Sequence, residues 1–205
     1  MRWLLPRAIL LIFIFSAISG ASIWIARQQP APERVAMLHL TDCQLPCWIG
    51  ITPGVTTMDE AEQKILRVYG NAPNIKIEFI EGDQRFQVKN AITGKVVFDV
   101  YLRYSSRDDS KIYSIAILFD NQPPSIGDLI TLLGHPTRIA YLYPIDIKPP
   151  PVLIYKNYGL AIIYAGTLEL NAEISLPVDR LILWTDDMGT LSTPQPWSGF
   201  HSYDE

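Results

Sequence analysis

The sequence predicts an α+β protein in which an N-terminal transmembrane helix precedes an antiparallel sheet with two helices packed on one face. Three observations predict this class. An apolar run opens the chain, two segments carry helix-capping residues, and short runs of alternating polarity follow each of them. The expected organisation is a signal anchor (1–28), a linker (29–40), an extracytoplasmic domain (41–184) and a flexible tail (185–205).

The apolar run spans residues 8–26, nineteen residues without a charge, between Arg7 and Arg27. As a helix it would just cross a hydrocarbon core of roughly 30 Å. Two arginines before the run and one after it favour a cytoplasmic N-terminus. The sequence therefore predicts a single-pass protein of the cell membrane whose C-terminal domain is extracytoplasmic.

A cleaved signal peptide is the alternative for the same run. Ser19 and Ala21 place small residues at the −3 and −1 positions of a cleavage site, and cleavage there would release a secreted protein. The run continues past this point through Trp24, a residue that suits a membrane interface. The uncleaved anchor is therefore the preferred interpretation.

The charge balance of the exported part excludes some partners. The first 28 residues hold three of the 17 basic residues and none of the 21 acidic ones, so the remainder has 14 basic against 21 acidic residues, a formal charge of −7. Nucleic acid and anionic lipid headgroups are bound through clustered Lys and Arg. We expect no nucleic-acid partner.

Cys43 and Cys47 are the only cysteines of the chain. In an oxidising compartment two cysteines this close usually pair, and Pro46 bends the chain between them. A redox site and a metal site with His39 as a further ligand are the alternatives. However, the C-x-x-x-C spacing departs from the thioredoxin pattern, and a zinc site needs further ligands. The sequence predicts a structural disulfide.

The residues around this pair predict an elbow between the linker and the domain. Trp48 is expected to pack on the core, and Pro53 and Gly54 are expected to lead into the first helix.

Two helices are expected in the exported part. In the first, Thr57 and Glu60 match a capping box, apolar residues recur at helical spacing, and Gly70 marks the end. The second begins after Ser125, a favoured N-cap residue, and ends at Gly134.

Runs of β-prone residues follow each helix. Because short alternating runs are separated by Gly, Asp and Ser turns, the first group predicts an antiparallel meander. The predicted strands are residues 75–80, 85–89, 95–104 and 111–119 after the first helix, and 137–143, 152–155, 160–164 and 180–184 after the second. In the third strand Asp99 and Arg103 share a face, and we expect them to form an ion pair.

The two helices share a format that suggests two repeated helix-then-sheet modules, residues 41–120 and 121–184. Each follows a proline, opens with Thr or Ser, and stops at a Gly that a proline soon follows. The format Gly54-Val55-Thr56 with Leu133-Gly134-His135-Pro136 resembles that of SmpA/OmlA-type outer-membrane assembly lipoproteins. This resemblance implies a small α+β fold and transfers no functional residue, because the lipobox is missing here. The C-x-L-P-C-W-x-G-I-x-P-G opening resembles that of membrane-anchored bacterial proteins for which it implies no activity.

No pattern in the sequence identifies a catalytic residue, a metal site or a cofactor. The motifs of serine hydrolases, zinc proteases, phosphate-binding loops and EF-hands are missing, and the three histidines are dispersed. A surplus of aromatic residues gives the candidate binding groove for a peptide or glycan. Its residues are Tyr141, Tyr143, Tyr155, Tyr158 and Tyr164.

The functional prediction is a membrane-anchored binding or assembly module of the bacterial cell envelope, in which a sheet face or edge engages a protein, peptide or glycan partner. The alternative is an envelope hydrolase whose site is assembled from dispersed residues.

Overall fold

The computed structural model describes residues 12–22, 24, 32–80, 84–104, 110–141, 151–155, 159–164, 175–184 and 194–197. The chain forms two compact units, Met1–Pro32 and Glu33–Glu205. In the first unit residues 12–22 are helical. Among the described residues, no helical segment combines the length and the hydropathy that a membrane span requires.

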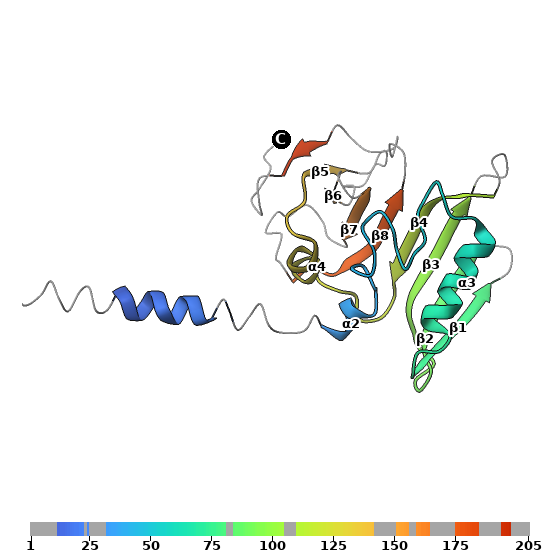
Figure 1. Ribbon diagram of the computed structural model, residues 1–205, viewed down its shortest axis with the longest axis horizontal. Helices are drawn as coiled ribbons and strands as arrows, with labels where there is room; N and C mark the ends of the chain where they lie inside the picture. The colour runs from blue at the N-terminus through green and yellow to red at the C-terminus, as the bar shows by residue number, and fades with distance from the viewer. Residues whose placement is uncertain are drawn as a thin grey trace, which may run out of the picture. The chain divides into compact units, whose positions relative to one another are not determined.

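The second unit is built on one antiparallel sheet of nine strands (Figure 1). Their order across the sheet is β1-β2-β3-β4-β8-β7-β6-β5-β9. The strands are β1 (Ile75–Ile80), β2 (Arg85–Asn90), β3 (Val96–Tyr104), β4 (Ile112–Phe119), β5 (Arg138–Tyr141), β6 (Pro151–Tyr155), β7 (Leu160–Tyr164), β8 (Val178–Trp184) and β9 (Gln195–Pro196). The α+β class and the antiparallel sheet predicted from the sequence are confirmed.

Three helices accompany this sheet: α2 (Glu33–Ala36), α3 (Met58–Tyr69) and α4 (Ile126–Leu133). Thr57 and Glu60 form the predicted capping box of α3, in which each side chain accepts from the other residue's backbone N–H. Ser125 and Asp128 form the same box at α4. Both helices therefore begin where the sequence predicts them.

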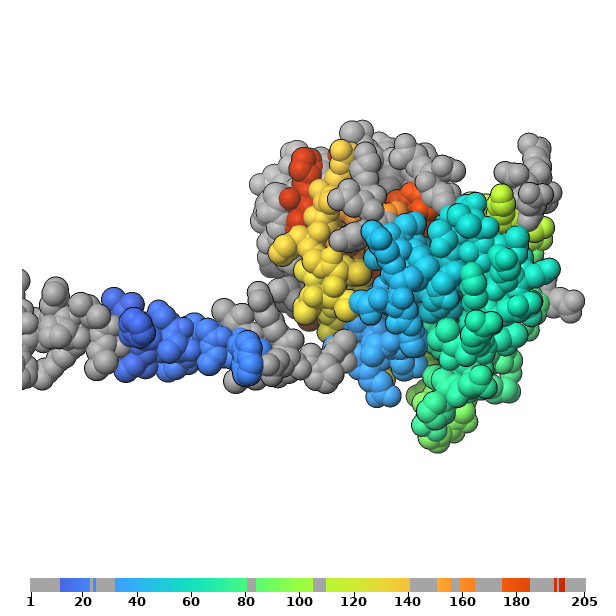
Figure 2. Space-filling view, viewed as in Figure 1, coloured from blue at the N-terminus to red at the C-terminus, as the bar shows by residue number. Residues whose placement is uncertain are grey.

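One face of the sheet carries a continuous apolar core. Buried apolar residues lie opposite one another on neighbouring strands, for example Val88 opposite Phe98 and Leu102 opposite Ile115. Such pairs continue through β8, β7 and β6 to Ile139 of β5. The buried residues of α3 and α4 belong to the same cluster as this face. In Figure 2 residues 33–57 (blue to cyan), α3 (teal) and α4 (yellow) cover the face turned to the viewer. The helices thus bury the apolar face that the period-two pattern produces.

The two halves of the sheet have matching hydrogen bonds. The residue before the first N-cap, Thr56, accepts from the N–H of Ile112 at the start of β4, and Pro124 accepts from Val178 at the start of β8. The N-caps themselves form isolated bridges, Thr57 with Lys111 and Ser125 with Pro177. In both halves a capped helix is followed by four strands, and the last strands, β4 and β8, pair antiparallel at the centre.

This pairing gives the halves a local two-fold relation. Matching Ile112 with Val178 also matches Ala116 with Ile182, and these two residues lie directly opposite each other. The arrangement makes β1 and β5 corresponding strands.

The domain extends beyond the limits that the sequence predicts. Val35, Leu38 and Leu40 of the predicted linker are buried in the core, because α2 and the following turn pack on it. Residues 195–196 of the predicted tail form β9, which pairs with β5. The linker is thus shorter than expected, and part of the tail belongs to the sheet.

Candidate functional site

Cys43 and Cys47 form the predicted disulfide, with their Cα atoms 5.7 Å apart. Because both sulfurs are bonded to each other, neither is available as a thiolate ligand or nucleophile in this state. His39 instead pairs with Asp42, with 2.8 Å between Nδ1 and Oδ2. The elbow is thus closed by the disulfide that the sequence predicts.

Trp48 anchors the elbow in the core. Its indole is fully buried, and Nε1 donates to the carbonyl oxygen of Leu38 at 2.7 Å. Pro53 is also buried. Gly54 has φ of 80°, and its N–H donates to the carbonyl oxygen of Ile112 in β4 at 2.6 Å. A positive φ of this size favours glycine. The elbow is therefore fastened to both the core and the centre of the sheet before α3 begins.

The predicted tyrosine groove is not assembled among the described residues. Tyr155 is buried, and its hydroxyl donates to the carbonyl oxygen of Gly134 at 2.9 Å. Tyr164 is buried in the same core. Both side chains pack behind the helices, because they occupy core-facing positions of β6 and β7. Tyr141 lies in β5, whereas Tyr143 and Tyr158 lie outside the described residues.

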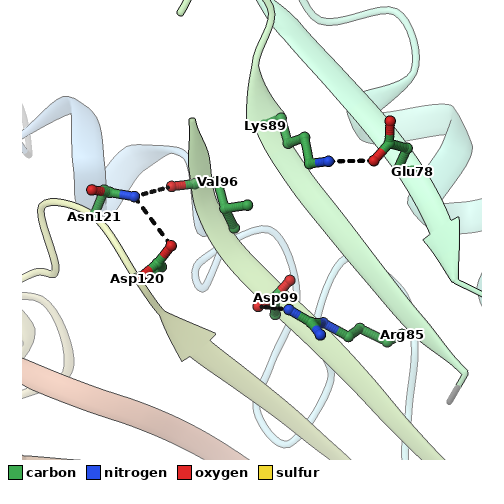
Figure 3. A network of polar contacts seen from close by, with 7 residues as sticks. All are labelled: Glu78, Arg85, Lys89, Val96, Asp99, Asp120 and Asn121. Atoms are coloured by element: carbon green, nitrogen blue, oxygen red, sulfur yellow. Dashed lines mark hydrogen bonds and ion pairs between the residues drawn. The ribbon is translucent and has the colours of Figure 1, made fainter. Parts of the chain in front are cut away.

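The opposite face of β1–β3 is polar and carries two groups of ion pairs, one at Asp99 and one at Glu78 (Figure 3). Arg85 Nη2 lies 2.6 Å from Asp99 Oδ2, and its guanidinium stacks over Tyr101 at 5.4 Å. The sequence prediction for Asp99 was wrong in its partner. Arg103 lies four residues further along the same strand, whereas Arg85 comes from the neighbouring strand and lies within hydrogen-bond distance.

The second group of ion pairs lies at the edge of the sheet. Glu78 of β1 accepts from Lys89 of β2 through Oε2 and from Lys76 through Oε1, the latter at 3.1 Å. The hydrogen bond from Lys89, followed by that from Lys76, lowers the pKa of the Glu78 carboxyl. Glu78 is therefore held in its anionic form, while the side chain of Lys76 remains 64% exposed.

The free edge of β1 is the feature that the sequence did not locate. Among the described strands none pairs with β1 on the side away from β2, whereas the corresponding strand β5 pairs with β9 on its outer side. The ring of Phe79 in β1 packs on that of Phe86, with 4.8 Å between the ring centroids, yet Phe79 remains 43% exposed. An unpaired strand edge with exposed apolar side chains is a template for another strand.

The register shows which backbone groups point outward at this edge. Ala91 donates to the carbonyl oxygen of Asn74 at 2.7 Å, next to the pair of Ile75 with Asn90. In an antiparallel ladder, residues alternate between those that bond to the neighbour and those that face away. The even residues of β1 therefore bond to β2, and Ile75, Ile77 and Phe79 face outward. Ile77 and Phe79 direct both their N–H and C=O groups to this side, whereas Ile75 directs its C=O there and its N–H donates to the carbonyl oxygen of Ala72 at 3.3 Å.

α3, which contacts β1, has an exposed leucine on the side of the helix away from the elbow. Lys64 Nζ donates to the carbonyl oxygen of Gly50 in the elbow at 2.6 Å, which fixes that side of α3. Leu66 follows two positions later, about 200° around the helix, and is 45% exposed. Its side of α3 is the side away from the elbow, and α3 contacts β1. We refer to β1 with Leu66 as the open edge.

Comparison of the chain with protein-family models, with curated proteins and with solved structures gives no match.

Proposed function

We propose that this chain is a membrane-anchored binding or assembly module of the bacterial cell envelope, whose extracytoplasmic domain binds a protein partner as an added strand at the open edge. The carrying observation is the difference between the two corresponding edges. β5 accepts a strand, β9, from its own chain, whereas β1 has the same position in the first half and no such strand among the described residues.

Strand addition suits the chemistry of this edge. The three outward residues offer three backbone acceptors and, at Ile77 and Phe79, two donors, because the Ile75 N–H donates to Ala72. Ile75, Ile77 and Phe79 alternate along the strand with charged Lys76 and Glu78. In such binding the main-chain hydrogen bonds supply affinity, while alternate side chains select the partner. The two-module repeat predicted from the sequence supports this proposal, because it makes the β5–β9 pair a guide to what β1 binds.

The anchor part of the proposal is supported by the N-terminal unit. The described side chains of residues 12–18 are strongly apolar and exposed, Phe13 at 75% and Phe15 at 67%. Exposed apolar surface of this kind is typical of a membrane or protein contact site. Cell fractionation and N-terminal sequencing test it: a mature chain that begins near Ser22 would overturn the anchor.

A photo-crosslinking residue at Phe79 of the full-length chain, in intact cells, tests the binding edge. We expect protein adducts from position 79 and none from Val55, which is 68% exposed in the turn before α3. Ile77→Pro should abolish the adducts, because it removes one outward N–H that the added strand would bind. The sheet itself should tolerate this proline, because the N–H of Ile77 faces away from β2. The matched variant Ile77→Val should retain them. Adducts that persist in Ile77→Pro would contradict strand addition.

A further inference from the structure

We propose that the strand added at the open edge is β1 of a second copy of this chain, paired antiparallel about Ile77. The inference rests on the proposed function and names the partner of the same edge. It follows from the outward backbone groups and from the charge pattern of residues 75–80, IKIEFI.

Backbone geometry limits the registers that two copies can adopt. Ile75, Ile77 and Phe79 are the outward residues of β1, so each hydrogen-bonded pair must join two of them. Ile77 and Phe79 offer N–H and C=O groups, whereas Ile75 offers its C=O, because its N–H donates to the carbonyl oxygen of Ala72 at 3.3 Å. A two-fold pairing centred on Ile77 uses all of them, with Ile77 opposite Ile77 and Ile75 opposite Phe79 in both directions. Centres at Lys76 or Glu78 leave one outward residue of each copy without its counterpart.

The charges select the same register. With Ile77 at the centre, Lys76 of each copy lies directly opposite Glu78 of the other copy. A centre at Lys76 would instead place two lysines opposite each other, and a centre at Glu78 would oppose two glutamates. Opposite charges stabilise a directly facing cross-strand pair, and like charges destabilise it.

The existing contacts of Glu78 are compatible with this arrangement. Its Oε2 holds Lys89 of the neighbouring strand, and its Oε1 accepts from Lys76 of the same strand. The exposed Lys76 ammonium can transfer from its own Glu78 to that of the second copy, while the Lys89 contact remains. Each Glu78 carboxylate would then still be bound by two lysines, Lys89 of its own chain and Lys76 of the other copy.

The core-side residues gain burial in the same register. Phe79, 43% exposed in the single chain, would lie beside Ile75 of the second copy. Leu66, 45% exposed, lies on the side of α3 away from the elbow, where the second copy would join. Pairing would cover apolar surface on one face and match charges on the other.

Register-specific crosslinking of two differently tagged full-length chains, co-expressed in cells, tests the proposal. We expect a disulfide-linked dimer when one copy carries Lys76→Cys and the other Glu78→Cys, because directly opposite Cβ atoms lie roughly 5 Å apart. Two copies with the same substitution should give little product, since diagonal positions are separated by roughly 7–8 Å. Equal product from all combinations, or none from the mixed one, would overturn the register.

Charge exchange gives a second measurement without new cysteines. Lys76→Glu alone and Glu78→Lys alone should each lose co-purification of the two tags, whereas a mixture of the two variants should recover it. The double variant K76E/E78K should also self-associate. Loss in every combination would contradict the charge-matched pairing.

The two proposals fail in distinguishable ways. If photo-adducts at Phe79 are sensitive to Ile77→Pro but contain only a different protein, strand addition stands and the second-copy inference is overturned. If the adducts are insensitive to Ile77→Pro, strand addition itself is overturned.

Discussion

At the scale of single residues, Tyr69 joins the elbow, α3 and the sheet. Its ring lies edge-on to Phe98 of β3 at 5.7 Å and is tilted against Trp48 at 6.2 Å. Its hydroxyl donates to the carbonyl oxygen of Met37 at 2.9 Å. Burial raises the pKa of the Tyr69 phenol above its ordinary value, and the Asp42 carboxylate adds to the rise. The neutral phenol is thus part of the folded structure.

Tyr69→Phe should therefore lower the free energy of unfolding by about 1 kcal/mol near neutral pH, the typical net contribution of one hydrogen bond. Because the folded pKa is raised, the stabilisation by the neutral phenol is complete below the unfolded pKa of about 10 and is lost as the pH rises above it. The variant should show a smaller alkaline loss of stability. Urea unfolding at neutral and alkaline pH measures both effects, with Tyr113→Phe, at a residue 45% exposed, as control. An unchanged alkaline slope in Tyr69→Phe would contradict this account.

Arg85 and Asp99 show the limit of sequence reasoning at this scale. The period of a strand predicts that Asp99 shares a face with Arg103, and the burial of Phe98 and Val100 on the other face agrees. The partner on the next strand depends on register, and a bulge between Val88 and Lys89 shifts the register of β2 against β3. Single-strand periodicity contains no information on that shift.

At the scale of elements, capping residues and alternating apolar runs predicted the helix starts and several strand bounds, because these depend on neighbouring residues in the sequence. The capping box of Thr57 and Glu60 and the N-cap residue Ser125 predicted where the two helices begin. The first strand, Ile75–Ile80, and the seventh, Leu160–Tyr164, were predicted with the observed bounds. β9 was missed, because a two-residue strand with a proline has no pattern of its own and exists only through its pairing with β5. The open edge was missed for the same reason: strand order is a long-range property.

Gly159, the residue before β7, lies close to both the elbow and the end of β8. Gly159 has φ of 52°, and a Cβ added there would lie 2.6 Å from the carbonyl oxygen of Trp184 and 3.3 Å from Pro46 Cβ. The elbow and the end of β8 therefore approach this backbone as closely as glycine permits.

Gly159→Ala should cost about 2–3 kcal/mol, from the positive φ together with the close approach to Trp184. Gly94→Ala is the matched control, since Gly94 has φ of 68° but no atom within 4 Å of the added Cβ. Its expected cost is about 1 kcal/mol. Denaturant midpoints of the two variants compare them directly, and an equal cost would show that the contact with Trp184 and Pro46 contributes nothing.

At the scale of the whole molecule, the two edges of the sheet are treated differently. β9 covers the β5 edge, and the following Trp197 donates its N–H to Thr137 at 3.2 Å and packs on the core. The N-terminal half has no described counterpart of this strand. Within the described part of the chain, one edge of the sheet is therefore covered by a strand and the other is unpaired.

Trp197→Ala should loosen β9 and open the second edge. We expect faster hydrogen exchange at the backbone amides of Arg138–Tyr141, because those on the outer side lose their cover, and unchanged exchange in Val96–Tyr104. Mass spectrometry of the full-length chain measures both segments. Uniform acceleration in both would mean that the substitution destabilises the whole domain instead of one edge.

The central pairing of β4 with β8 also sets the order in which the domain is completed. β1 to β4 follow one another along the chain and pair by hairpin connections, whereas β4 must wait for β8, which is synthesised after β5, β6 and β7. Non-local pairings of this kind form late in folding. During synthesis the first meander therefore has two unpaired strands at its sides, β1 and β4, until β8 is available. Among the described strands β8 closes the side at β4, so a nascent chain that stalls before Val178 would leave β4 as well as β1 unpaired and open to aggregation.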